Sequence, residues 1–209
     1  MKRIPELLSS AVILACFLIW VMMSRSPKPL LTLLAVGLHE MGHVLTALIC
    51  RVPLSGFYVV AGEARLLLSG TASYTKELLI CGAGPLFNLL SAAPILLAGG
   101  TVLGDDNLSF FATVSLALAL LNLLPIGDLD GGRIYYCFLA RLGGPHFSLA
   151  ACRILSFFTV FCLWSASVYT LLRAGENLSL FFFSASLFLR LFPMDRIGGI
   201  KSIQKDSSE

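Results

Sequence analysis

The chain has 209 residues, of which 57% are hydrophobic and 13% are charged, and its mean hydropathy is +0.87. A soluble domain carries roughly 25% charged residues, so the apolar surplus of this chain has to face lipid. The composition excludes a soluble enzyme and a secreted disulfide-linked domain, and a net charge of +3 is too small to indicate a nucleic-acid partner.

Apolar runs of about 20 residues are long enough to span a bilayer, and they predict an all-α membrane protein with six transmembrane helices. In chain order the predicted spans are 7–23, 30–50, 78–97, a broken fourth helix made of 108–124 and 134–142, then 147–172 and 178–192. The first run resembles a signal peptide but lacks a small-x-small cleavage site, so we expect a retained helix. We expect one polytopic domain over 1–209, with its core at 30–142 and a polar cytoplasmic tail at 193–209.

The segment after the second span has a different character. Two strand-like runs, 57–60 and 64–68, flank a turn at Gly62-Glu63. An open sheet edge cannot lie in lipid, so we expect a small β-hairpin at the membrane surface. Two interpretations stay open: the hairpin offers a strand edge to an extended substrate, or it only caps the helix bundle.

Lys and Arg residues in short loops mark the cytoplasmic side of a membrane protein. With six spans, both termini share one side, and that side receives most of the basic residues. Its basic residues are Lys2, Arg3, Arg51, Arg65, Lys76, Arg133, Arg141, Arg196, Lys201 and Lys205, against Arg25, Lys28 and Arg173 on the other. We therefore expect a multi-pass plasma-membrane protein with both termini in the cytoplasm.

The second span contains the sequence GLHEMGH over residues 37–43, which includes the pattern H-E-x-x-H. His39 and His43 are four residues apart, so both imidazoles lie on one helix face and can reach one ion. Glu40 is offset around the helix and can act as a general base without being a ligand. Ionisable residues inside a span are costly and usually functional. The alternative is a pair of polar residues that only form hydrogen bonds with each other inside the helix bundle.

A catalytic zinc site needs three protein ligands and one open position. His146 lies near a span boundary and is better explained as an interfacial loop residue. The break at 125–132 is a better source of the third zinc ligand, because Pro125 ends the helix and the segment contains both Asp128 and Asp130. Irregular backbone at membrane depth lines a cavity or is buried in protein. The residues alone leave either aspartate as the third ligand.

Three motifs in order resemble the site-2 protease family of intramembrane zinc metalloproteases: HEMGH in the second span, GAGPLFN over 82–88 in the third, and NLLPIGDLDG over 122–131 in the fourth. The resemblance implies one zinc ion per chain, held by His39, His43 and Asp130, with Glu40 as the catalytic residue.

The same resemblance implies roles for further residues of the motifs. Asn122 is expected to hold the substrate or polarise its carbonyl, and Asn88 to have a packing or polar-cluster role. Pro125 and Gly131 complete the third motif. The six-span layout with a hairpin, and without a PDZ-like insertion, is closest to the sporulation-type branch, which cleaves a membrane-associated pro-sigma factor.

The expected function is therefore a zinc metalloendopeptidase that cuts a membrane-tethered protein in or near its membrane segment. Its expected partners are the lipid bilayer, a membrane-associated protein substrate and membrane regulatory subunits, with no nucleic acid. A transporter or channel is the first alternative, since broken helices with acidic residues also form ion sites. A non-catalytic relative is the second, although every expected catalytic residue type is present.

Overall fold

The computed structural model describes residues 24, 26–52, 54–60, 63–68, 73–98, 106–127, 129–174 and 178–191. The predicted first span at 7–23 and the polar tail at 193–209 lie outside these residues. The chain divides into two compact units, Met1–Leu121 and Asn122–Glu209. The expectation of one domain over 1–209 stays a prediction.

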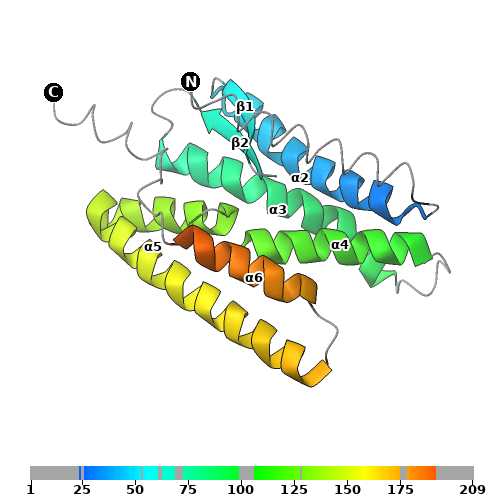
Figure 1. Cartoon of the computed structure of the whole chain (residues 1–209). Helices are drawn as coiled ribbons and strands as arrows, with labels where there is room; N and C mark the ends of the chain where they lie inside the picture. The colour runs from blue at the N-terminus through cyan, green and yellow to red at the C-terminus, as the bar shows by residue number, and fades with distance from the viewer. Residues whose placement is uncertain are drawn as a thin grey trace, which may run out of the picture. The chain divides into compact units, whose positions relative to one another are not determined.

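The first unit contains the helices α2 (Lys28–Ile49), α3 (Tyr74–Leu97) and α4 (Asp106–Asn122, whose last residue begins the second unit). Proline in the first turn suits the start of α2, because a helix leaves that N–H without an internal partner. Helix α3 begins four residues before the predicted span at Leu78, and Glu77 in its first turn suits the positive end of the helix dipole. Figure 1 shows α2 lying along α3.

Small residues allow α2 and α3 to approach closely. A Cβ atom added to Gly42 would lie only 2.7 Å from the backbone carbonyl oxygen of Ala83. The buried residues of the two helices include Ala35, Gly42, Ala47, Ala83, Gly84 and Ala92. In lipid no hydrophobic effect drives helices together, so helix association depends instead on close packing of small residues.

Two strands follow α2 and pair antiparallel: β1 (Leu54–Val60) and β2 (Glu63–Leu68). A hairpin is therefore found where the sequence predicts one, although β1 begins three residues earlier than the predicted run at Phe57. Glu63 pairs with Val60 as the first residue of β2, instead of lying in the turn. The location of this hairpin at the membrane surface stays a prediction.

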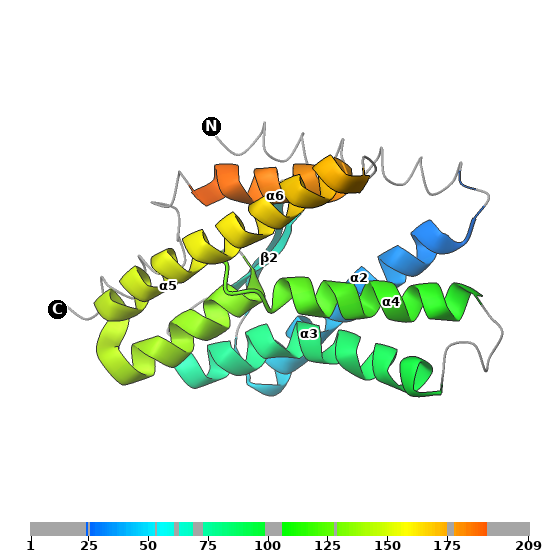
Figure 2. The same ribbon diagram turned by 90° about the horizontal axis from the view of Figure 1, so that it is seen from below.

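The second unit is built on α5 (Asp130–Ala174), which bends at Gly144 (Figure 2). Gly144 has φ 79° and ψ 170°, a conformation that glycine adopts without the steric cost of a side chain. The predicted runs 134–142 and 147–172 are thus joined through the bend, and the Ser148 hydroxyl donates to the Tyr136 carbonyl across it at 2.7 Å. His146 lies exposed within the helix, which corrects its expected place in a loop.

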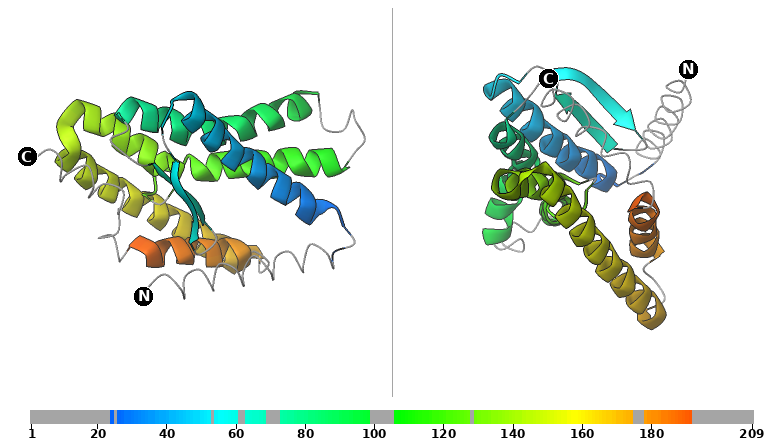
Figure 3. Two further views of the ribbon diagram at one scale, coloured as in Figure 1. Left: turned by 90° about the horizontal axis from the view of Figure 1, so that it is seen from above. Right: turned by 90° about the vertical axis from the view of Figure 1, so that its left-hand side faces the viewer.

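Helix α6 (Leu178–Leu191) packs against the second half of α5 (Figure 3). Val160 of α5 and Leu187 of α6 form a buried apolar cluster with Ile126, which precedes α5. A polar contact lies on the same interface, where the hydroxyl oxygens of Ser167 and Ser184 are 2.8 Å apart and both residues are fully buried. These contacts attach the segment before α5 to the packed helix pair.

Three of the described helices, α2, α3 and α5, are long and apolar enough to cross a membrane, and α4 is a shorter apolar helix. Large apolar side chains on their surfaces are exposed, for example Leu30, Leu90 and Phe158, which are each about 60% exposed. Large residues outside and small residues inside are what lipid-facing helices require. These findings agree with a multi-pass membrane protein, whereas the number of six spans stays a prediction.

We predict that Gly42→Ala lowers the stability of the protein by about 1–3 kcal/mol, the usual cost of overpacking a close contact. Gly37→Ala is the matched control, because a Cβ atom added at Gly37 of the same helix meets nothing within 4 Å. Both changes raise helix propensity by about 1 kcal/mol. Thermal unfolding in detergent, followed by circular dichroism, measures the difference. Equal unfolding temperatures for the two variants would contradict the packing argument.

Candidate metal centre

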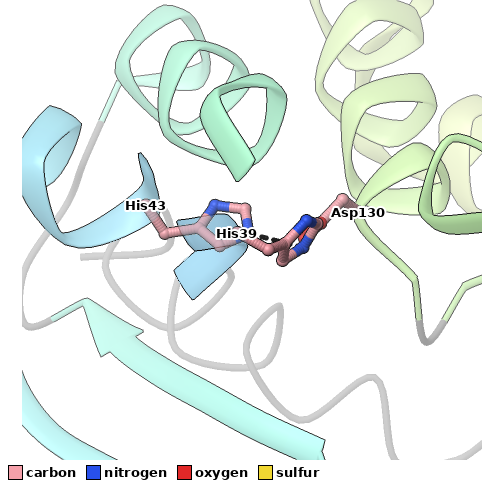
Figure 4. Close-up of side chains that lie close together, drawn as sticks. All are labelled: His39, His43 and Asp130. Atoms are coloured by element: carbon pink, nitrogen blue, oxygen red, sulfur yellow. Dashed lines mark hydrogen bonds between the residues drawn. The ribbon is translucent and has the colours of Figure 1, made fainter. Parts of the chain in front are cut away.

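The side chains of His39 and His43 face each other on α2 and are both buried, with 6% and 8% of their surface exposed. Their Nε2 atoms lie 3.2 Å apart and the ring planes cross at 80°. Figure 4 shows this pair with the contact between the rings dashed. The predicted i, i+4 pairing is therefore present.

The separation of the two nitrogens fits a shared zinc ion. Two imidazole nitrogens at about 2.0–2.1 Å from one tetrahedral zinc are about 3.3 Å apart. The Nε2 atoms of His39 and His43, at 3.2 Å, already have this spacing. The donor set and its geometry thus fit the metal that the sequence motif indicates.

One face of α3 positions both rings. Ile80, Gly84 and Asn88 are spaced by four residues and therefore share a helix face. The carbonyl oxygen of Ile80 accepts a hydrogen bond from Nδ1 of His43 at 2.7 Å. The Nδ2 atom of Asn88 lies 3.3 Å from Nδ1 of His39. Each ring is thus held through Nδ1, and each Nε2 is left facing the other ring.

Gly84 lies between these two contacts and leaves room for the imidazole tips. A Cβ atom built on Gly84 would overlap Nε2 of His43 and would lie 2.9 Å from Nε2 of His39. A side chain at position 84 would therefore collide with the Nε2 ends of both rings.

Glu40 follows His39 directly on α2 and is half-buried. Successive residues of an α-helix are about 100° apart around its axis, so Glu40 is on the flank of the face that carries the two histidines. This placement agrees with the prediction that Glu40 lies next to the helix face that carries the two histidines and is not itself a metal ligand.

The break in the second unit covers 123–127 and 129, between the end of α4 and the start of α5. Ser156 of α5 holds its backbone: the hydroxyl accepts from the N–H of Gly127 and donates to the carbonyl of Pro125, each at 3.1 Å. Unpaired backbone groups are very costly in an apolar environment, so this hydroxyl stabilises the irregular segment. Asp128 lies outside the described residues.

Asp130 is the half-buried first residue of α5, which corrects the predicted break of 125–132, because 130–132 are helical. Figure 4 draws its side chain at the start of that helix. A Cβ atom at Gly131 would collide with the carbonyl of Leu123. Glycine is therefore required directly after Asp130 for the first turn of α5 to pack on the break. Asn122, also predicted as a site residue, is the half-buried last residue of α4.

Sequence reasoning did not find the roles of Ile80, Gly84 and Ser156. A backbone carbonyl such as that of Ile80 carries no residue-type signal. For Gly84, the four-residue spacing to Asn88 was a usable signal, since it places both residues on one face of the third span. Serine occurs often in apolar helices, so Ser156 gave no distinct signal.

Residues 105–166 match the family model described as peptidase family M50. The chain carries a peptidase family M50 segment. This confirms the predicted resemblance to the site-2 proteases. The M50 segment includes Asn122 and Asp130, whereas the H-E-x-x-H motif precedes it in the chain.

Two curated proteins are similar to parts of this chain. It is 29% identical over 118 residues to Stage IV sporulation protein FB of Bacillus subtilis (strain 168), covering 54% of this chain and 41% of that protein. It is 31% identical over 99 residues to Protease RseP of Photorhabdus luminescens, covering 44% of this chain and 42% of that protein. The matches thus span about two fifths of each relative.

A solved structure has a similar fold over most of the chain. Site-2 Protease from Methanocaldococcus jannaschii superposes with a TM-score of 0.60 at 21% identity, covering 91% of this chain and 89% of that chain. The fold is therefore of the site-2 protease type.

We predict that Gly84→Ala prevents stoichiometric zinc binding, because the added methyl group fills the space beside both Nε2 atoms. Loss of a hydrogen-bond partner of a metal ligand lowers metal affinity by about 10–100-fold, and we expect the zinc affinity of Gly84→Ala to fall by more than that. Gly82→Ala is the matched control, since a Cβ atom there meets nothing within 4 Å. Zinc titration of the detergent-purified, metal-free variants against a chelator measures the effect. Tight zinc binding by Gly84→Ala would show that the ion does not lie beside these nitrogens.

Proposed function

We propose that the chain is an intramembrane zinc metalloendopeptidase that hydrolyses a peptide bond in or near the membrane segment of a membrane-tethered protein. The observation that carries this proposal is the buried pair of imidazole rings. Their Nε2 atoms lie 3.2 Å apart and next to Gly84, which has no side chain. The spacing of the two nitrogens supports this proposal because it matches that of two imidazoles on one tetrahedral zinc.

Asp130 is the proposed third ligand. His39, His43 and Asp130 each offer one ligand atom, two imidazole nitrogens and a carboxylate oxygen. Three protein ligands leave the fourth position of a tetrahedral zinc open for water or substrate, as catalytic sites require. The motif match at Asp130-Gly131 supports this residue over Asp128.

Zinc, when bound, would supply Lewis acidity, lowering the pKa of a bound water molecule toward about 7 and polarising the scissile carbonyl. Glu40 takes a proton as water attacks that carbonyl and returns it to the leaving amine. Asn122 holds the substrate carbonyl and stabilises its developing negative charge through its side-chain N–H. Glu40 belongs to the first of the three motifs and Asn122 to the third.

The substrate has to be extended at the cleaved bond, because a helix occupies its carbonyls in internal hydrogen bonds. The β1–β2 hairpin is the proposed docking edge, where an extended segment adds as a further strand. The alternative role of the hairpin is a cap on the bundle, with no contact to substrate.

We further propose that the chain belongs to the sporulation-type branch and acts on a membrane-associated pro-sigma factor. The similarity to Stage IV sporulation protein FB supports this branch. In this proposal both termini are cytoplasmic, the protein lies in the plasma membrane, and membrane regulatory subunits control it.

Glu40→Gln tests the proposed reaction. We expect this variant to bind one zinc per chain and to lose about 10²–10⁴-fold of its cleavage rate, the usual contribution of a general base. Co-expression with a panel of membrane-tethered candidate substrates, read by immunoblot against the wild type, measures cleavage. Unchanged cleavage would exclude Glu40 as the base, and ion transport that survives the change would favour the transporter alternative.

Asp130→Asn tests the third ligand, with Asp128→Asn as its control. We expect Asp130→Asn to lose both zinc and cleavage, because one of three ligands is replaced by a neutral amide. Asp128→Asn should keep substantial activity. Zinc content by elemental analysis, beside the cleavage assay, separates the two variants. The reverse ranking would assign the third ligand to Asp128.

A further inference from the structure

The second half of α5 contains a stretch without charge whose length matches the thickness of a membrane. Residues 154–172 have no charged side chain, and Arg153 and Arg173 lie directly before and after them. About 20 helical residues at 1.5 Å each span about 30 Å, which is the thickness of the hydrocarbon core of a bilayer. The guanidinium of Arg173 lies 5.6 Å from the ring centroid of Tyr169, and tyrosine is enriched where a helix leaves the membrane. We therefore expect the two arginines at the two membrane surfaces.

Arg153 belongs to a continuous exposed stripe along one face of α5. Spacings of three and four residues keep side chains on one helix face, and the members of this α5 stripe are His146, Ala150, Arg153, Phe157, Phe161 and Trp164. All of them are exposed. The stripe changes character at Arg153, because it is polar and basic toward the bend at Gly144 and aromatic on the other side.

The aromatic part of the α5 stripe is a flat apolar surface. The rings of Phe157 and Phe161 are stacked, with centroids 6.2 Å apart and planes within 15° of each other. Trp164 is stacked in turn on Phe188 of α6, at 6.2 Å and 27°. Trp164 follows Arg153 by about 16 Å along the helix axis. This distance is close to half of the about 30 Å hydrocarbon core, which is the depth that the acyl chains of one leaflet fill.

The basic part of the α5 stripe fits an anion. Apart from Asp130 at its first position, α5 has no acidic residue, and the described helix α6 has none. Anionic headgroups attract arginine side chains near the membrane surface, and a guanidinium group binds phosphate through two parallel hydrogen bonds. Ala150 lies between His146 and Arg153 on the stripe, and its small side chain leaves space for a headgroup.

We propose that the α5 stripe binds a phospholipid with an anionic headgroup. The headgroup phosphate contacts Arg153, and one acyl chain lies along the rings of Phe157, Phe161 and Trp164. An apolar helix of another protein would also cover these rings, but it would leave the arginine charge without a partner at the edge of the contact. Charge complementarity therefore favours the lipid. The proposal depends on the position of α5 in the membrane and not on the zinc site, so it goes beyond the proposed function.

Trp164 can report on the bound lipid, because the chain has only two tryptophans. Trp20→Phe leaves Trp164 as the one fluorescent indole. The full-length variant is placed in bilayers of phosphatidylcholine that contain increasing fractions of either phosphatidylglycerol or phosphatidylcholine with brominated acyl chains. Bromine quenches indole fluorescence only at short range, so the quenching measures which lipid lies on the stripe. We expect phosphatidylglycerol to bind about fivefold better than phosphatidylcholine, which is the usual gain from one arginine near anionic headgroups.

Variants of the two arginines test which residue recognises the headgroup. Arg153→Gln in the same background should remove the preference, so that both brominated lipids quench Trp164 equally. Arg153→Lys keeps the charge and should retain most of the preference. Arg173→Gln is the matched control, because Arg173 is also exposed but lies at the other end of the apolar stretch. At about 100° per residue it is also on the opposite helix face from Arg153, so the preference should stay unchanged.

Three outcomes would overturn the lipid site. Equal quenching by the two lipids with Arg153 in place would show that the stripe faces only bulk lipid. A preference that survives Arg153→Gln would show that another group recognises the headgroup. Absence of quenching by either lipid would show that another helix or a second copy of the chain covers the stripe. Neither zinc binding nor cleavage is measured in this experiment, so its failure would leave the proposed function unaffected.

Discussion

The close contact between α2 and α3 is the constraint on which the candidate site depends. Gly42 brings the backbones together, and Gly84 leaves an open position opposite the two histidines. Only at this short distance can Ile80 and Asn88 reach the Nδ1 atoms of the rings. A packing feature that serves helix association in lipid therefore also orients the two histidine rings of the candidate site.

The two histidines are held by chemically different partners. A backbone carbonyl holds His43, and its position is set by α3 itself. A side-chain amide holds His39, and an amide can present either a donor or an acceptor in nearly the same space. The two rings are therefore held in place by α3 through different kinds of group, one from its backbone and one from a side chain.

The second unit contains a stretch of irregular backbone, whose polar groups need hydrogen-bond partners inside an apolar protein. Ser156 satisfies two backbone groups of the break, and Ile126 anchors it to the apolar cluster of α5 and α6. Gly131 then lets the first turn of α5 pack directly on the break. Asp130 is therefore presented from a helix end whose position is fixed by several contacts, and not from a free loop.

The sequence by itself determined the membrane class, the paired histidines and the hairpin, because these depend on composition and on local periodicity. Residues four apart share a helix face in any fold, so His39 and His43 needed no tertiary information. The tertiary structure alone decided which groups hold their outer nitrogens, where the break ends and how α5 continues through its bend. Those features depend on contacts between distant segments, such as Ile80 with His43 or Ser156 with Pro125. Backbone carbonyls and serine hydroxyls can make such contacts at almost any position, so residue type alone does not reveal them.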